Sequence, residues 1–355
     1  MKIVADKAIP FLQGVLEPYA EVVYRDGASF TAGDVRDADA LLTRTRTRCD
    51  AALLEGSKVK VIASATIGLD HVDRDWCRSR GIEVCNAPGC NAGGVVQYVA
   101  SAVYGTARRR GVSLDGLTIG IIGVGNVGRR VAALFGKLGF RVLANDPPRA
   151  AAEGPEGFCG LEQLLAESDI VTLHVPLDES TRGMADAAFF AGMKKRTVFG
   201  AGPMFINASR GEVVDEQAML SAMPSIGAAV LDTWNHEPEI SRELLAMVDI
   251  ATPHIAGYSY QGKQNGTAAA VRAVARHLGI PELIDFYPRT ENPDKNPQKL
   301  WLSGLNQAEI ASILQRNYPI FTDDAMLRAE PERFEDLRKH YDYRAEFRVD
   351  GMDIN

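Results

Sequence analysis

The stretch TIGIIGVGNVGRRVAALFGKLGFRVLANDPPR, residues 118–149, decides the fold of this chain. Its apolar run over 118–124 predicts a buried parallel strand, and the glycine-rich sequence over 123–128 predicts a tight turn that opens a helix. A second apolar run over 141–145 predicts another strand, which ends at Asp146. A strand, tight turn, helix and strand with an acid at its end are typical of a dinucleotide-binding βαβ unit.

The turn in this stretch has residues suited to a pyrophosphate. Gly123, Gly125 and Gly128 allow the backbone to approach the phosphates closely. Asn126 and Val127 precede the helix, whose N-terminus offers unpaired N–H groups and the positive end of the helix dipole. A tight turn without a ligand is the alternative, and the surrounding strands favour the dinucleotide site.

The acid at the end of the second strand indicates which dinucleotide binds. A carboxylate at Asp146 accepts hydrogen bonds from the adenosine ribose and repels the additional phosphate of NADP. Arg149 could serve such a phosphate, but Pro147 and Pro148 stiffen the path to it. The sequence therefore predicts NAD as the cofactor.

Composition narrows the class of protein. The chain has 355 residues, 46% of them hydrophobic, which is enough for two or three globular domains. The net charge of -7 favours neither nucleic acid nor a membrane surface as a partner. The N-terminal sequence lacks the apolar run of a signal peptide, so we expect a cytoplasmic protein. Five cysteines without a CxxC pair favour neither a disulfide framework nor a metal site.

Short apolar segments continue on both sides of the dinucleotide motif. Before it we expect strands in KIVAD, AEVVYRD, ADALLTRT, VKVIASAT and GIEVCNAP, and after it in DIVTLHV, MFINAS, AAVLDT and VDIATPH. Helical patterns over 91–110 and 215–223 separate some of them. This alternation predicts an α/β protein with doubly wound parallel sheets, in which ligands bind at the carboxyl ends of strands.

Three residues of complementary chemistry follow three successive predicted strands. His254 is suited to take a hydroxyl proton near neutral pH, and the carboxylate of Glu237 would orient its ring and stabilise the imidazolium. Arg210 offers paired donors for a carboxylate and polarises the oxygen being oxidised. We interpret these residues as the catalytic group of a 2-hydroxy acid dehydrogenase, with Glu239 as a rival for the carboxylate role.

The segments GVGNVG, NASRGEVVD, DTWNHEP and TPHIAG together resemble the D-isomer-specific 2-hydroxyacid dehydrogenases. Further segments, ATIGLDHVD, NAPGCNA, NDPPRA and PHIAGYSYQGK, resemble the members that oxidise 4-phospho-D-erythronate in vitamin B6 biosynthesis. The resemblance covers nearly the whole chain. It implies NAD-dependent oxidation of this acid to 2-oxo-3-hydroxy-4-phosphobutanoate.

The resemblance also implies an organisation into three domains. They are a flavodoxin-like substrate or lid domain over 1–92 that is completed by about 258–280, a Rossmann NAD-binding domain over 93–257, and a small α+β dimerisation domain over 281–355. A homodimer is therefore expected. The apolar residues Trp301, Leu302, Leu305, Ile310, Ile313 and Leu314 suggest the same, because a small domain would bury them only partly by itself. The alternative is that this segment packs back on its own chain.

The resemblance assigns site residues individually. It implies that Arg210 and Glu237 are catalytic and that His254 gives or takes the proton. Beyond the glycine-rich turn, the cofactor contacts it implies are Asp146, Val175, Ala208, Ser209, Arg210, Asp232 and Gly257. The substrate contacts it implies are Thr45, Thr66 and Tyr258.

The basic sequence RTRTR, Arg44 to Arg48, fits a substrate that carries both a carboxylate and a phosphate. Arg44 and Arg46 alternate along an expected extended strand end, so we expect them to share a face and to bind the phosphate. A solvated strand end without a ligand is the alternative interpretation.

Two other functions stay open at this point. Another 2-hydroxyacid dehydrogenase, acting on 3-phosphoglycerate or a glyoxylate or hydroxypyruvate type of substrate, would have the same catalytic residues. The fold also serves NAD-responsive binding proteins that have no turnover. The presence of Arg210, Glu237 and His254 favours an enzyme.

Overall fold

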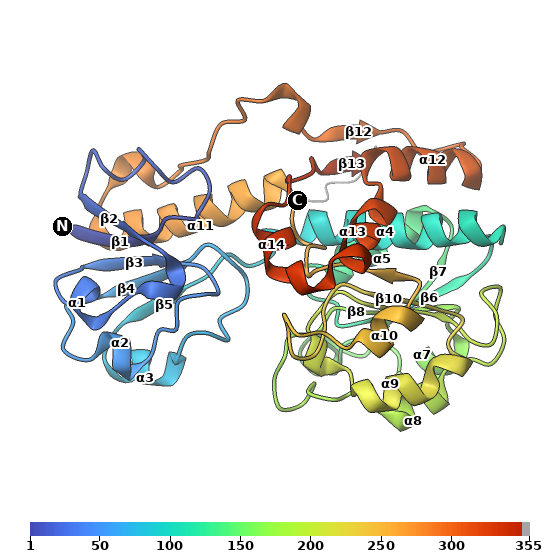
Figure 1. Ribbon diagram of the computed structural model, residues 1–355. Coiled ribbons are helices and arrows are strands. Elements are labelled where there is room, and N and C mark those ends of the chain that lie inside the picture. Colours follow the sequence, from blue (N-terminus) through green and yellow to red (C-terminus); the bar gives the residue numbers. More distant parts are fainter. Residues whose placement is uncertain (350–355) are drawn as a thin grey trace. The chain divides into compact units, whose positions relative to one another are not determined.

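The computed structural model describes residues 1–349 and contains two compact units, each built on a parallel sheet. The first unit consists of Met1–Asn91 and Ser259–Asn296, and the second consists of Ala92–Tyr258 with the residues from Pro297 to the end of the described chain. The segment expected as one domain over 281–355 is thus divided at Asn296. Figure 1 labels helices and strands of both units.

The first unit has five parallel strands in the order β2-β1-β3-β4-β5, which is the flavodoxin-like order. The strands are β1 Lys2–Asp6, β2 Glu21–Arg25, β3 Ala40–Thr43, β4 Val61–Ser64 and β5 Glu83–Cys85. The helices are α1 Ala32–Val35, α2 Ala51–Leu54, α3 Arg74–Ser79 and α11 Tyr260–Leu278. All five strands expected before the dinucleotide motif are confirmed.

Helices cover both faces of this sheet, and the apolar strands explain why. Val61 and Ala63 of β4 belong to the core under α11, whereas Ile62 belongs to the core over α2 and α3. Figure 1 shows α11 on one face and α1 to α3 on the other. Because both faces are buried, the strands are apolar in sequence without an alternating polar side.

The second unit has six parallel strands in the order β11-β10-β9-β8-β6-β7. The strands are β6 Thr118–Ile122, β7 Arg141–Asn145, β8 Ile170–Leu173, β9 Met204–Asn207, β10 Ala228–Leu231 and β11 Ile250–Ala251. The helices are α4 Ala92–Arg110, α5 Gly128–Lys137, α6 Pro147–Glu153, α7 Leu161–Glu167, α8 Ala187–Gly192, α9 Glu216–Ala222 and α10 Arg242–Met247. The doubly wound fold is confirmed, with its topological switch point between β6 and β8.

The central strands of this sheet are buried on both sides. Met204 and Ile206 of β9 pack in the core with α4 and α5, while Phe205 packs with α7 to α10. Such a sheet directs the carboxyl ends of its strands toward one edge. That edge is where the predicted functional residues lie.

The C-terminal segment of the second unit packs on α4. Its elements are β12 Gln298–Leu300, α12 Gln307–Asn317, α13 Ile320–Ala329, α14 Phe334–Lys339 and β13 Phe347–Val349, and β12 pairs in parallel with β13. Ile310 and Leu314 of α12 are buried in the core that contains α4. Gly105 of α4 permits this approach, because a β-carbon there would overlap with Gln315 and Phe321.

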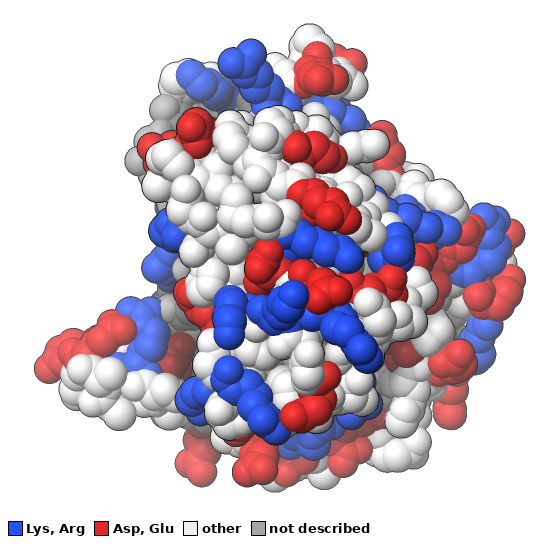
Figure 2. Space-filling view, turned by 90° about the vertical axis from the view of Figure 1, so that its left-hand side faces the viewer, with Lys and Arg blue, Asp and Glu red and all other residues white. Residues whose placement is uncertain are grey.

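Two properties of the surface bear on function. Figure 2 shows basic and acidic side chains alternating in small groups over the face it presents. Among residues 1–349, no helix is long and apolar enough to cross a membrane.

Candidate active site

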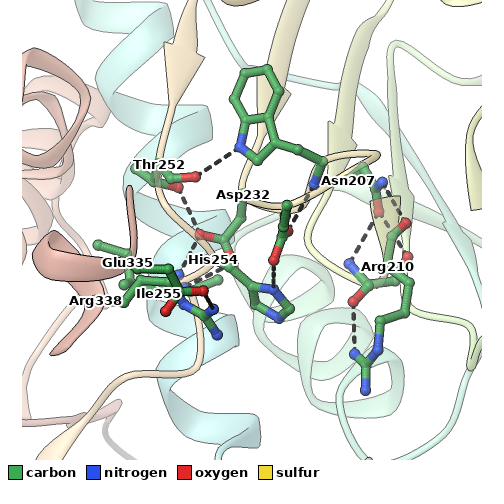
Figure 3. Close-up of polar contacts among 12 residues, drawn as sticks. Asn207, Arg210, Asp232, Thr252, His254, Ile255, Glu335 and Arg338 are labelled. Carbon is green, nitrogen blue, oxygen red and sulfur yellow. Dashed lines mark hydrogen bonds and ion pairs between the residues drawn. The ribbon is translucent and has the colours of Figure 1, made fainter. Parts of the chain in front are cut away.

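Three adjacent strands of the second unit position the predicted catalytic residues. Arg210 follows β9, Glu237 follows β10 and His254 follows β11, and these strands are neighbours in the sheet. Since the strands are parallel, their carboxyl ends lie at the same edge. The placement expected from the sequence is therefore observed, and Figure 3 shows the Arg210 and His254 side chains at this edge.

Glu237 and His254 form a hydrogen-bonded pair. The His254 Nδ1 atom lies 2.8 Å from Glu237 Oε2, and the side chains are 29% and 18% exposed, respectively. Because a carboxylate only accepts hydrogen bonds, Nδ1 carries the proton and Nε2 remains as the proton acceptor. Glu239, the rival carboxylate, is exposed and its backbone N–H bonds to His236 instead. The structure thus brings Glu237 to the histidine.

The surroundings keep Glu237 ionised. Burial acts to raise the pKa of this carboxyl, but the facing His254, the Trp234 backbone N–H at 3.0 Å from Oε1 and the charge of Arg338 outweigh burial and hold its pKa below the usual value. A carboxylate in this state fixes the ring orientation of His254. It also stabilises the positive charge that the ring gains when it takes a proton.

Asp232, expected to contact the cofactor, holds the turn that carries His254. It is 1% exposed, and its carboxylate accepts hydrogen bonds from the Thr252 hydroxyl at 2.7 Å and from the N–H groups of Ile255 and Ala256 at 2.7 and 2.9 Å. Burial raises the pKa of Asp232, against the opposing effect of these bonds and of His254. These contacts support the left-handed backbone of His254, whose φ is 56°.

Arg210 lies in a tightly packed loop. Its Nη1 donates to the Ser209 carbonyl at 2.8 Å, and Asn207 holds the loop by donating from Nδ2 to the Arg210 carbonyl and accepting from the Ser209 backbone N–H. Gly211 comes so close to the next strand-end loop that a β-carbon would overlap with the Trp234 carbonyl. The contacts of the sequence NASRG therefore fix the backbone position from which the Arg210 side chain extends.

The glycine-rich turn has the geometry expected for a dinucleotide site. Gly123 has a φ of 83°, and a β-carbon on Gly128 would overlap with the Gly123 carbonyl, whereas Gly125 faces open space. Asn126 and Val127 lie at the start of α5, where Val127 makes no side-chain cap bond. The residues present at this turn therefore fit a pyrophosphate at the helix N-terminus.

Asp146 and Arg149 are both tied to this turn. Asp146 accepts from the Val124 N–H at 2.8 Å through Oδ2 and caps α6 by accepting from the Arg149 N–H at 3.1 Å through Oδ1. The Arg149 guanidinium donates to the Val124 carbonyl at 2.7 Å and pairs with Glu153. The charge of Arg149, which could favour NADP, is thus paired with a carboxylate, and each Asp146 oxygen retains the capacity to accept another bond.

The remaining expected contact residues of the second unit lie at strand ends too. Val175 follows β8 and would be met by a β-carbon on Gly123. Ala208 and Ser209 follow β9, and Gly257 and Tyr258 lie in the turn after His254, where the Tyr258 N–H bonds to the Ile255 carbonyl at 2.8 Å.

In the first unit, the expectation for the basic sequence is wrong in its geometry. Strand β3 ends at Thr43, and a turn over 45–47 prevents Arg44 and Arg46 from alternating along an extended end. The physical reason is that Arg44 turns to the buried Asp6, with Nε 2.9 Å from Oδ2. Thr45 and Arg46 are exposed, and the Thr66 hydroxyl lies 2.8 Å from Ser64 Oγ.

Two arginines of the C-terminal segment were not anticipated at this edge. Arg344 is 8% exposed and donates to the carbonyls of Ile255 and Ala256, directly after His254, and to that of Gly94. Arg338 contacts Tyr258. Neither follows a strand of the large sheet, so the strand-end argument that located the other residues has no signal for them.

Comparisons with known proteins identify the family. Residues 94–256 match the model of the D-isomer specific 2-hydroxyacid dehydrogenase NAD binding domain. The chain is 44% identical over 353 residues to an erythronate-4-phosphate dehydrogenase of Bacteroides thetaiotaomicron, covering 98% of this chain and 97% of the relative. It is 39% identical over 357 residues to the enzyme of that name from Yersinia enterocolitica, covering 98% and 93%.

A solved structure agrees with this assignment. The NAD⁺-bound 3-phosphoglycerate dehydrogenase of Entamoeba histolytica is similar with a TM-score of 0.65 and 25% identity, over 78% of this chain and 95% of that one. The resemblance inferred from the motifs is confirmed, as is the prediction of an NAD-binding enzyme. The chain belongs to the D-isomer-specific 2-hydroxyacid dehydrogenase family, within the erythronate-4-phosphate dehydrogenases.

Proposed function

We propose that this enzyme oxidises 4-phospho-D-erythronate to 2-oxo-3-hydroxy-4-phosphobutanoate with NAD, as a step of vitamin B6 biosynthesis. The observation that carries the proposal is the 2.8 Å contact between His254 Nδ1 and Glu237 Oε2, at the strand edge that also carries Arg210. The names of relatives similar over 98% of the chain supply the substrate. The same arrangement suits any 2-hydroxy acid, so the substrate needs its own test.

In this proposal each of the three residues contributes to the oxidation of C2. His254 takes the proton of the C2 hydroxyl at Nε2, while the C2–H bond breaks and the C2–O bond becomes a carbonyl. Glu237 stabilises the imidazolium so formed, and Arg210 pairs with the substrate carboxylate and polarises the C2 oxygen. Bound NAD supplies the acceptor for the hydride that leaves C2.

The residues proposed to hold the cofactor lie in the second unit. The turn from Gly123 to Gly128 would hold the pyrophosphate, and Asp146 would accept hydrogen bonds from the ribose. Around the nicotinamide we propose Val175, Ala208, Ser209, Asp232 and Gly257. Asp232 acts mostly through the turn, because Oδ1 and Oδ2 are already engaged by internal donors.

The experiment that tests the function is turnover with a panel of acids. NADH formation is measured with 4-phosphoerythronate, erythronate, 3-phosphoglycerate and glycerate at equal concentrations. We expect the highest kcat/KM for 4-phosphoerythronate. A higher value for 3-phosphoglycerate or glycerate would assign another substrate within the family, and no turnover with any acid would favour an NAD-responsive binding protein.

The substrate-binding roles of Arg44, Thr45, Arg46, Thr66 and Tyr258 remain proposals that rest on the family resemblance. The salt bridge between Arg44 and Asp6 reduces what Arg44 offers to a phosphate. Arg46 is exposed and is the better candidate of the two. The expected location in the cytoplasm and the roles expected for the domains also stay predictions.

A homodimer is also proposed, with the C-terminal segment contributing to it. Half of the six apolar residues that suggested it, Leu302, Ile310 and Leu314, are buried in the core of their own chain. Trp301, however, is 66% exposed. Light scattering of the full chain and of Trp301→Glu tests the proposal, because a dimer that weakens in the variant supports it and a wild-type monomer contradicts it.

A further inference from the structure

We propose that Arg338, with the hydroxyl of Tyr258, binds the phosphate of the substrate. Arg338 lies in α14 of the C-terminal segment, and Tyr258 follows His254 by four residues. The inference rests on the proposed function and adds to it a residue that determines specificity for phosphorylated acids.

The guanidinium of Arg338 is held in place but incompletely paired. Its side chain is 17% exposed, and Nη1 lies 3.2 Å from Glu335 Oε1, whereas Nη2 lies a long 3.5 Å from the Tyr258 hydroxyl. Its Nε is buried and has no hydrogen-bond partner among the described residues. An enclosed N–H without an acceptor is costly, so the hydrogen-bonding capacity of this guanidinium is incompletely used within the protein.

Aromatic rings orient this group. The guanidinium carbon lies 5.9 Å from the ring centroids of both Tyr258 and Phe334. Tyr258 is itself packed edge-on against Tyr341 and Tyr343, with ring centroids 6.1 Å apart in each pair. Arg338 therefore has a fixed direction, which favours paired recognition of a phosphate over a mobile surface charge.

The position of Arg338 relative to the chemistry indicates which substrate group it meets. Its charge acts on Glu237, which bonds to His254. In the view of Figure 3, the His254 ring lies between Arg338 and Arg210. When the C2 hydroxyl is at His254 and the carboxylate is at Arg210, the opposite end of a four-carbon acid points away from Arg210, and that end carries the phosphate.

The test compares phosphorylated and unphosphorylated substrates. KM is measured for 4-phosphoerythronate and erythronate in wild type, Arg338→Met and Arg338→Lys. Because one charge-assisted contact is lost, we expect Arg338→Met to raise KM for 4-phosphoerythronate roughly 10- to 100-fold. Arg338→Lys should retain part of the affinity, and KM for erythronate should change little. Lys339→Met, the loss of the adjacent exposed charge in α14, is the matched control and should behave as wild type.

A second measurement separates this inference from the proposed function. Inorganic phosphate is titrated into the NAD-loaded wild type and Arg338→Met by calorimetry, with thermal melting as a check of folding. Weaker phosphate binding in the variant supports the inference even if wild type does not oxidise 4-phosphoerythronate, which would refute the proposed function alone. An equal rise in KM for both acids in Arg338→Met would overturn the role of Arg338. So would phosphate binding that is absent in wild type or unchanged in the variant.

Discussion

The turn after β6 and the turn after β11 lie at the same edge of one sheet but are stabilised differently. In the first, Val124 bonds to Asp146 and Arg149, which are 22 and 25 residues away in the sequence. In the second, the carbonyls of Ile255 and Ala256 accept from Arg344, which is 89 and 88 residues away. The dinucleotide turn is thus completed within its own βαβ unit, whereas the histidine turn depends on the C-terminal segment.

This difference separates cofactor binding from chemistry in physical terms. Changes in the turn after β6 should mainly alter NAD affinity. Changes in the turn after β11, where Gly257 is the proposed nicotinamide contact, or in the residues that hold it, should alter proton transfer more than NAD affinity. Variants that affect both properties equally would contradict the separation. Four variants test this separation.

The largest expected effect is that of His254→Ala. Removal of the proton acceptor should lower turnover roughly a hundredfold or more, while NAD affinity stays nearly unchanged because the glycine-rich turn is untouched. Turnover is measured with saturating acid, and NAD affinity by fluorescence titration. A parallel loss of NAD affinity would show that the two turns are not independent. His236→Ala, the exposed histidine near Glu237, is the matched control.

Arg344→Met should have the next largest effect. The substitution removes the Arg344 donor from the buried carbonyls of Ile255, Ala256 and Gly94, of which that of Ile255 keeps only the Tyr258 N–H, so we expect the free energy of unfolding to fall by about 2 kcal/mol or more. Turnover should fall more than NAD affinity, since the affected carbonyls directly follow His254. Denaturant titration and kinetics measure the two effects.

The control for Arg344→Met is Arg348→Met, which removes an exposed arginine four residues further along. It should leave stability and turnover near wild type. If Arg344→Met reduced NAD affinity as much as turnover, Arg344 would support the whole unit and would have no particular role in positioning the histidine turn.

Arg338 and Arg344 show which part of the site could not be predicted from the sequence. The strands and the strand-end residues Arg210, Glu237 and His254 could be predicted because a strand buried on both faces is a continuous apolar run, and its functional residue follows within a few positions. The partners Arg338 and Arg344 come from a segment that packs on α4, and nothing near β11 in the sequence indicates them.

The basic sequence after β3 shows a related limit. The pattern of arginines predicted a shared face, but Arg44 is directed by Asp6, which is 38 residues earlier and fully buried at the end of β1. An extended strand would leave that buried carboxylate without its ion pair to Arg44, which is costly. The sequence therefore indicates the charge of these residues, whereas the direction of the Arg44 side chain depends on Asp6 of the neighbouring strand β1.

A smaller effect is expected from Asp146→Asn. In wild type, NAD should be favoured over NADP by at least roughly tenfold, about 1.4 kcal/mol, because the carboxylate repels the additional phosphate. Asn retains one oxygen for the α6 cap but has no charge, so the preference should narrow while kcat changes little. Binding titrations with both dinucleotides measure it, and equal wild-type affinities would remove Asp146 from this role.

The smallest change expected is a shift in pH dependence from Glu237→Gln, with kcat/KM measured across pH. The pKa of Glu237 is below its usual value, so this carboxyl stays ionised across the neutral range and its own titration does not shape the profile there. Its charge nevertheless favours the protonated ring of His254, 2.8 Å away. Without that charge, protonation of the ring is less favourable, and the acidic limb for oxidation should move to lower pH, where more of the ring remains an acceptor.

Glu239→Gln is the matched control, because it removes an exposed carboxylate two residues away, and its profile should match wild type. A shift of the pH profile in Glu239→Gln with none in Glu237→Gln would show that Glu239, and not Glu237, is the partner of His254. If the two turns act separately, NAD affinity should be unaffected in both variants.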